Sequence, residues 1–434
     1  MKNKGRRALG ILLILAMTLC TLTGCAGSRQ ETRTADGKVK IRAYLGGGDL
    51  SEKISKMVED FNAQSETTEV EVVPMPADTA SMITVMFNSG NTPTVMALET
   101  GDLLRAKDRL TDISDLDAVK YASQGTLDAA EEDGKVYGVP YRIEAMGLIY
   151  NRAVLDKVLG KDFDPDTIRT QDDLKKVFSQ IQSAGIAPVV LGAQDWSLST
   201  HLTTDIYTGQ SETSEGRAKF IESLKNGTAN LADNQIFNQV MDTVDILKEN
   251  NYYKDNPLQY ANDGDTTKQA RILTEGKAAF WFQGNWGSTA LEELDADGEY
   301  GMIPLPVGND DTYPNERIAT LVPLYLSVYK GATEEEQQAG KELIDYVTQT
   351  ERGWDFVVND AKGIPAYDNA TVEVTNGISK SILNYQNEGR TKVAYMANTA
   401  DHYVDTGAAL QRYLDGQINR EEVAEAYEEY WRAK

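Results

Sequence analysis

Cysteine and histidine are scarce in this chain of 434 residues, which contains two of each. Cys20 and Cys25 both lie near the N-terminus, while His201 and His402 are far apart in the sequence. So few side chains of these types exclude zinc sites built from histidine and cysteine, as well as nucleophilic Cys–His pairs. The HExxH, GxSxG and GxxxxGKS/T motifs are also missing. We therefore expect no metal and no cofactor.

Positive charge is scarce as well. The chain has 43 Lys and Arg against 67 Asp and Glu, a net charge of -24. This balance argues against a basic face that binds nucleic acid or anionic lipid. It does not favour an anionic ligand either, although a local pocket can override the average. With so many carboxylates, pairs close enough for glycoside hydrolysis arise by accident, and no spacing favours that chemistry.

A long apolar run occurs only at the N-terminal end. It extends from Ala8 to about Leu22 and follows four basic residues. A basic head followed by a short apolar segment is typical of a secretory signal, and this run is too short for a comfortable membrane span. It ends in LTGC at residues 22–25, which resembles the bacterial lipobox, where a cysteine becomes acylated after cleavage. A signal anchor with an incidental Cys25 is the alternative.

We therefore predict a signal peptide over residues 1–24, a lipidated Cys25, and a flexible tether over residues 25–38. Loss of the four basic residues would take the net charge from -24 to about -28. The mature chain would keep one cysteine, which carries lipid, so no disulfide can form. A body of about 410 residues suggests two or more domains, held outside the cytoplasmic membrane of a bacterium by lipid alone.

Strand and helix patterns alternate along this body. Residues 39–45 place apolar side chains on one face with a period of two, and Asp49 with Glu52 forms a capping-box pattern before a helix. Strands at 69–75 and 93–99 enclose a helix at 78–89. This βαβ order predicts an α/β fold with parallel sheets, whose ligands bind beyond the carboxyl ends of strands. Thr170 and Asp173 predict a second capping box. Further elements are expected as a strand at 186–192 and helices at 151–159, 171–184, 216–225, 235–250, 266–275, 334–350 and 420–432.

Five segments occur in a specific order: the lipobox, YGVPYRIEAMGLIYNRAVLD (137–156), EGKAAFWFQGNWG (275–287), YGMIPLP (300–306) and KGIPAYDNA (362–370). Together they resemble the extracellular solute-binding lipoproteins of carbohydrate ABC transporters, the family that includes the maltose-binding protein. The resemblance implies two α/β lobes that close on a sugar, without catalysis. It also implies a monomer that delivers its ligand to permease subunits. The implied lobes are residues 39–147 plus 320–366 and residues 148–319 plus 367–434.

The resemblance also implies binding residues. In this family the tryptophan of the FQGNW turn stacks on the apolar face of a sugar ring, while carboxylates and amides bond to its hydroxyls. Phe280 and Phe282 are then core residues. The implied ligand-binding residues are Glu99, Asp102, Glu144, Asp195, Trp196, Asn285, Trp286, Asp401, His402 and Tyr403. The structural alternatives are a helix cap for Glu99 or Asp102, an ion pair with Arg142 for Glu144, packing for Trp196 and Trp286, and a helix face for His402.

Two other functions stay open. One is a binding protein for a non-sugar ligand such as a polyamine, iron or a peptide, and the other is a surface glycoside hydrolase. The loops at 195–215 and 251–265 match nothing in the family. We expect such loops to set the length and linkage of the sugar that binds.

Overall fold

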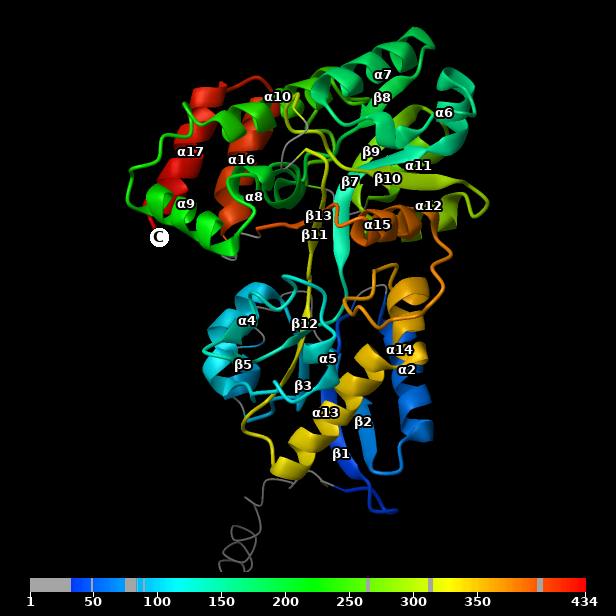
Figure 1. Ribbon diagram of the computed structural model, residues 1–434, viewed down its shortest axis with the longest axis vertical. Coiled ribbons are helices and arrows are strands. Elements are labelled where there is room, and N and C mark those ends of the chain that lie inside the picture. The colour runs from blue at the N-terminus through cyan, green and yellow to red at the C-terminus, as the bar shows by residue number, and fades with distance from the viewer. Residues whose placement is uncertain are drawn as a thin grey trace, which may run out of the picture.

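The computed structural model describes residues 33–47, 50–74, 83, 85–88, 90–262, 266–310, 315–395 and 401–434. Its strands form two large sheets, one in each half of an elongated molecule (Figure 1). The half with the N-terminal sheet is called lobe 1 and the other half lobe 2. The predicted signal peptide, Cys25, most of the tether, Asp49 and most of the helix predicted at 78–89 lie outside the described residues.

The sheet of lobe 1 has the strand order β2-β1-β3-β12-β6. β1, β2 and β3 are parallel, as the βαβ pattern predicts, and β12 runs antiparallel to both β3 and β6. The period-two pattern is confirmed, because Ile41 and Ala43 are buried. The strands are β1 (Val39–Tyr44), β2 (Thr68–Val72), β3 (Val95–Leu98), β6 (Val139–Pro140) and β12 (Tyr325–Val328), with a small separate pair β4 (Glu131–Glu132) and β5 (Lys135–Val136).

Helices pack on this sheet through apolar stripes. In α2, the residues Ile54, Val58 and Phe61 are buried at helical spacing. The helix begins at Ser51, and no side-chain hydrogen bond caps it at Leu50. The helices of lobe 1 are α2 (Ser51–Gln64), α4 (Thr100–Ala106), η2 (Lys107–Arg109), α5 (Asp117–Lys120), α13 (Glu334–Gln349), α14 (Glu351–Asp355) and η6 (Phe356–Asp360).

The sheet of lobe 2 has the order β13-β11-β7-β9-β8, and β10 pairs with β7. The predicted capping box is confirmed at the start of α7, where Thr170 Oγ1 accepts from the Asp173 N–H and Asp173 accepts from the Thr170 N–H. The strands are β7 (Glu144–Asn151), β8 (Ala187–Val190), β9 (Ala278–Gly284), β10 (Tyr300–Ile303), β11 (Ile318–Leu321) and β13 (Thr391–Val393). The helices are α6 (Arg152–Leu159), η3 (Pro165–Thr167), α7 (Gln171–Ser183), η4 (Ser197–Leu202), α8 (Asp205–Thr208), α9 (Ser214–Lys225), α10 (Gln235–Asn250), α11 (Thr267–Thr274), η5 (Asn285–Gly287), α12 (Ser288–Leu294), α15 (Gly377–Asn387), α16 (His402–Leu414) and α17 (Arg420–Arg432).

The chain crosses between the lobes beside the middle of the molecule. One crossing connects β6 to β7, and another connects β11 to β12 (Figure 1). Near the first crossing, Ile143 and Ile364 exchange backbone hydrogen bonds of 2.8 and 2.9 Å. Only residues 141–143 separate β6 from β7, and only residues 322–324 separate β11 from β12, so both crossings are short. The residue limits of the two lobes given above stay a prediction.

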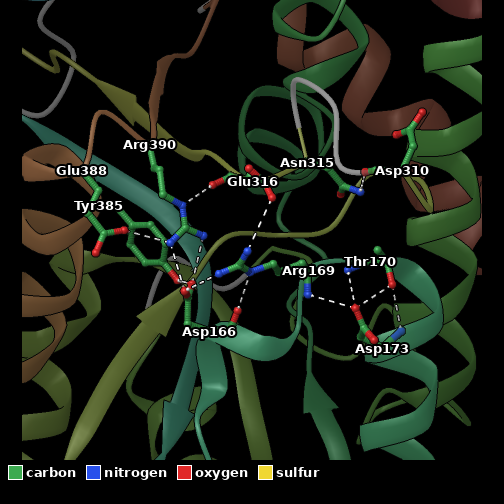
Figure 2. Close-up of polar contacts among 10 residues, drawn as sticks. All are labelled: Asp166, Arg169, Thr170, Asp173, Asp310, Asn315, Glu316, Tyr385, Glu388 and Arg390. Carbon is green, nitrogen blue, oxygen red and sulfur yellow. Dashed lines mark hydrogen bonds and ion pairs between the residues drawn. The ribbon is translucent and has the colours of Figure 1, made fainter.

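One carboxylate joins three segments of lobe 2. Asp166 accepts two hydrogen bonds of 3.0 Å from the Arg390 guanidinium, one of 2.5 Å from Tyr385 Oη, and one of 3.2 Å from Arg169 (Figure 2). Arg169 also pairs with Glu316 at 3.6 Å. Burial would raise the pKa of Asp166, but the hydrogen bonds from Arg390 and Tyr385 lower it below its usual value. This network fixes the corner between α15 and β13, so it holds the edge of the sheet next to the crossings.

Candidate functional site

Two adjoining cavities lie between the lobes. The larger has a volume of about 570 Å³ and is lined by residues 123–126 and 128 of lobe 1 and by residues of lobe 2 from α9, β11 and β13. The smaller, of about 320 Å³, lies between α4 and α9. They share the lining residues Gly125, Asp128, Ser214, Arg217 and Val393, so we treat them as one interlobe cleft. Its size is in the range of small-molecule sites.

Three aromatic rings form a row in lobe 2. The ring centroids of Trp196 and His201 are 5.3 Å apart at an angle of 75°, and those of His201 and Trp286 are 5.0 Å apart at 53°. His201 belongs to the π-helical turn η4, Trp196 directly precedes that turn, and Trp286 belongs to η5. All three residues are partly exposed. The two predicted tryptophans are therefore brought together, with His201 between them.

Trp286 lies at the edge of the interlobe cleft. Its ring covers Gly284, where an added Cβ would come within 2.1 Å of the indole. It also packs on a small apolar cluster of Met146, Ala319, Leu321 and Ala394. Leu321 and Ala394 line the smaller cavity. Glycine at position 284 is thus what allows the indole to rest on the end of β9 beside the cleft.

The other aromatic residues of β9 are core residues. Phe280 and Phe282 are buried in the core of lobe 2, as predicted. Trp281 is 0% exposed and packs in a different cluster, on the opposite face of the strand. Its Nε1 donates to Gln269 Oε1 at 3.2 Å. Of the two tryptophans in this segment, only Trp286 presents surface.

His201 is a site residue that sequence reasoning missed. Burial lowers its pKa to about 4, so the ring is neutral at neutral pH. A neutral imidazole between two indoles acts as a packing surface and needs no counter-charge. The only signal for His201 in the sequence was its short distance from Trp196. The folded chain is needed to place Trp286 on the other side of the imidazole.

The two predicted acids of lobe 1 have different surroundings. Glu99 is exposed and directly precedes α4, but its side chain does not cap the helix. Thr100, its neighbour, lines the smaller cavity. Loss of water around the carboxyl and the nearby Asp102 raise the pKa of Glu99. Asp102 itself is buried, pairs with Arg105 at 2.5 Å and lines a separate hollow of about 230 Å³. Glu99 therefore lies next to the cleft, and Asp102 faces away from it.

Glu144 and Asn285 hold the first crossing. Glu144 is buried and pairs with Arg142 at 2.7 Å. Asn285 is 0% exposed; its Oδ1 accepts from the Ala145 N–H at 2.8 Å, and its Nδ2 donates to the Lys362 carbonyl at 2.5 Å. Both ends of the Asn285 amide are thus bonded to backbone. These two side chains fix the geometry of the crossing beneath the cleft.

None of the predicted binding residues is among the residues that line the two cavities, and Asp195, Asp401 and Tyr403 are no exception. Asp195 is half-buried and accepts from the Trp196 N–H at 2.8 Å, which helps to position that indole. Asp401 is exposed and bonded to Tyr430 Oη at 3.2 Å, and Tyr403 is partly exposed.

His402 is a core residue. It is 0% exposed, with Nδ1 at 3.0 Å from Ser199 Oγ and Nε2 at 2.9 Å from Tyr207 Oη. Rings of Tyr427, Tyr430 and Trp431 surround it. Burial lowers the pKa of His402 to about 4. Its place inside lobe 2 leaves it no surface for a ligand.

Several residues of the cleft were not predicted. Ser214 Oγ of lobe 2 donates to the Asp128 carboxylate of lobe 1, which joins the two walls. Lys392 pairs with Asp205 at 2.7 Å, and both are buried. Arg217 lines both cavities. These residues come from distant segments and belong to no short motif, so no local pattern could have found them.

Among the described residues, no helix is long and apolar enough to cross a membrane. Within the same part of the chain, no group of three or more His, Cys, Asp or Glu side chains is arranged to hold a metal ion.

Two α/β lobes joined by short crossings around a cleft define the class of two-lobed binding proteins. The family model described as bacterial extracellular solute-binding protein matches residues 56–377, and the chain belongs to this family. The predicted family is therefore confirmed. Because its members are solute-binding proteins, the chain is a binding protein and not an enzyme.

Curated relatives and solved structures agree with this assignment. Two uncharacterized ABC transporter extracellular-binding proteins of Pyrococcus horikoshii are 24% and 21% identical to the chain. The first alignment covers 68% of this chain and 70% of the relative, and the second covers 89% and 86%.

Two solved structures share the fold. The apo form of RafE from Streptococcus pneumoniae has a TM-score of 0.72 at 17% identity and covers 91% of this chain and 98% of its own. A Bacillus licheniformis sugar transporter protein in complex with stachyose has a TM-score of 0.67 at 16% identity. The match covers 91% of this chain and 100% of that protein. The predicted two-lobed α/β fold class is confirmed.

Proposed function

We propose that this protein captures a sugar or oligosaccharide in the interlobe cleft and delivers it to the permease of an ABC importer. The observation that carries the proposal is the row of Trp196, His201 and Trp286, in which Trp286 packs on Leu321 and Ala394 of the smaller cavity. Similar structures support it, since RafE has been solved with raffinose and the Bacillus licheniformis protein with stachyose. The names of the Pyrococcus horikoshii relatives support a role beside an ABC transporter.

The chemistry of the cleft suits a sugar. A pyranose has an apolar face of C–H groups, which an indole covers well, and a rim of hydroxyls that need hydrogen bonds. Trp286 supplies the flat surface. Hydroxyl and amide side chains line the larger cavity and supply partners for the rim, namely Ser123, Gln124, Thr126, Thr213, Ser214, Thr320, Gln386 and Thr391.

The predicted binding residues divide into two groups in this proposal. Trp286, Trp196 and Glu99 contact the ligand: each has exposed surface, Trp286 and Glu99 lie beside the smaller cavity, and Trp196 joins Trp286 through His201. The others support the site from behind or lie further away, as their partners above indicate. This second group consists of Asp102, Glu144, Asp195, Asn285, Asp401, His402 and Tyr403.

The proposal includes the location of the protein. After cleavage before Cys25, a lipid on that cysteine anchors a monomer to the outer face of the bacterial cell membrane. The support is the LTGC sequence at residues 22–25, preceded by a basic and apolar leader. The tether at 25–38 would let the lobes reach the permease.

A thermal-shift screen tests the binding function. The purified mature protein is heated with a panel of mono- and oligosaccharides, and in parallel with polyamines, ferric iron and short peptides. A bound sugar stabilises by RT ln(1 + [L]/Kd), about 2.7 kcal/mol at a hundredfold excess over Kd. Mass spectrometry should then recover the sugar intact. Stabilisation by an amine, metal or peptide, with no effective sugar, would overturn the proposal.

A further inference from the structure

A buried arginine lies where the two cavities of the cleft meet. Arg217 belongs to the second turn of α9, is 8% exposed, and lines both cavities. Because Arg217 lines both, a ligand long enough to occupy both cavities would lie beside it.

The partners of Arg217 are all neutral. Its Nη1 donates to the carbonyls of Ser211 and Glu212 at 3.2 and 3.3 Å, and its Nη2 donates to Ser214 Oγ at 3.1 Å. In the part of the chain that the structure describes, no carboxylate lies within ion-pair distance of it. Two other basic residues of the cleft do have a carboxylate partner, because Lys392 pairs with Asp205 and Lys107 pairs with Glu132.

A buried guanidinium without a counter-charge is costly. Removing a charge from water is repaid only by a close opposite charge, and a guanidinium matches a carboxylate with two parallel hydrogen bonds. Ser214 connects Arg217 to Asp128 across the cleft, but only through its hydroxyl. A negatively charged ligand could therefore supply the counter-charge that Arg217 lacks.

The surroundings tolerate an anion. The larger cavity is lined by three basic side chains, Arg217, Arg317 and Lys392, and by three acidic ones, Asp128, Glu212 and Asp368. Over the whole chain there are 43 basic residues (Lys and Arg) against 67 acidic ones (Asp and Glu). The cleft thus departs from the acidic average of the protein. Arg217 also lies near the N-terminal end of α9, where the helix dipole favours negative charge.

We propose that the sugar bound by this protein carries a carboxylate, as in an oligosaccharide that contains uronic acid, and that Arg217 binds that carboxylate. This inference rests on the proposed function and narrows its ligand class. A charge-assisted pair with a buried guanidinium discriminates strongly against a neutral analogue, because the neutral analogue leaves the guanidinium unpaired.

The experiment uses ligands that differ only in charge. Oligogalacturonides and oligoglucuronides of two to four residues are titrated against the full mature protein, each beside its methyl ester. The ester keeps the ring and the hydroxyls and removes the charge. We expect an acid to bind about tenfold or more tightly than its ester, the range of a hydrogen bond between charged groups.

Three variants locate the effect. Arg217→Gln should bring the affinities for acid and ester close together, and Arg217→Lys should keep part of the preference because it keeps the charge. Lys107→Gln is the matched control, since it removes a cation of the cleft that already has a carboxylate partner. It should leave the preference within about threefold of the wild type. Melting temperatures of all variants confirm folding.

The outcomes separate this inference from the function on which it rests. Neutral oligosaccharides that bind tightly, with no preference for any acid, would overturn the role of Arg217 and leave the sugar-binding function standing. A preference for acids that survives in Arg217→Gln would also overturn it. No stabilisation by any sugar, charged or neutral, would overturn both.

Discussion

The imidazole of His201 lies 5.0 Å from the indole of Trp286, centroid to centroid, although the two residues come from different segments of lobe 2. The same imidazole lies 5.3 Å from Trp196. One ring therefore contacts two tryptophans, of which Trp286 lies at the edge of the cleft. A platform supported in this way is preorganised, because the ligand does not have to order the indoles when it binds.

His201→Ala should weaken sugar binding by about tenfold, because two aromatic contacts of the order of 1 kcal/mol each are lost. His201→Phe keeps a ring of similar size and should bind nearly as well as the wild type. Because the pKa of His201 is about 4, the affinity should stay constant from pH 8 to about pH 5. Isothermal titration calorimetry measures both effects. Wild-type affinity in the alanine variant would contradict this role.

His201 and His402 should make the protein less stable in mild acid. Burial lowers the pKa of His201 and of His402 to about 4, while a histidine in the unfolded chain titrates near 6.5. Between these values the unfolded state binds more protons, so the free energy of unfolding falls as the pH falls from about 6.5 to 4. The loss amounts to about 3 kcal/mol per histidine at most.

Urea unfolding at pH 7, 6, 5 and 4 measures this loss. His402→Gln lowers the stability at pH 7, because it disturbs the contacts to Ser199 and Tyr207, but it should flatten the slope between pH 6.5 and 4. A wild-type protein of constant stability over that interval would contradict the assignment of a neutral imidazole to His201 and His402.

Asp166→Asn should lower the free energy of unfolding by about 1–3 kcal/mol, since Arg390 and Arg169 lose their shared carboxylate. Because the pKa of Asp166 is lowered in the folded state, its contribution is present above about pH 4 and is lost as the pH falls further. Asp172→Asn is the control, because Asp172 forms an exposed pair with Lys175. Equal stabilities of the two variants would contradict the role given to the Asp166 network.

The lipid anchor predicts a modified N-terminus. Mass spectrometry of the protein from native membranes should find a diacylglyceryl group on Cys25 and no residue before it. Cys25→Ala should release the body from the membrane, whereas Cys20→Ala, which changes the other cysteine of the leader, should not. An unmodified N-terminus at another position would refute the anchor.

Local features of the fold could be predicted from the sequence, because they depend on neighbouring residues. The capping box of Thr170 and Asp173, the period-two pattern of β1, and the buried Phe280 and Phe282 were all readable in this way. Features that depend on tertiary contacts could not be predicted from the sequence. Arg217 belongs to no motif and acquires its position only because α9 meets lobe 1.

Asn285 illustrates the limit of resemblance. The FQGNW turn indicated correctly where a partly exposed tryptophan lies, but it could not tell which way the neighbouring amide points. In the folded chain that amide is bonded at both ends to the backbone of the crossing. His402 is similar, since its burial depends on Tyr207 and on α17, far away in the sequence.

The most direct test of the central claim compares Trp286→Ala with Trp281→Ala. Trp286 is partly exposed at the cleft, so its loss should leave the melting temperature largely unchanged and weaken sugar binding by a few kcal/mol. Trp281 is fully buried, so its loss should cost about 3–5 kcal/mol of stability. Sugar affinity and melting temperature are measured for both. A Trp286→Ala protein that is strongly destabilised, yet binds sugar with wild-type affinity, would contradict the account.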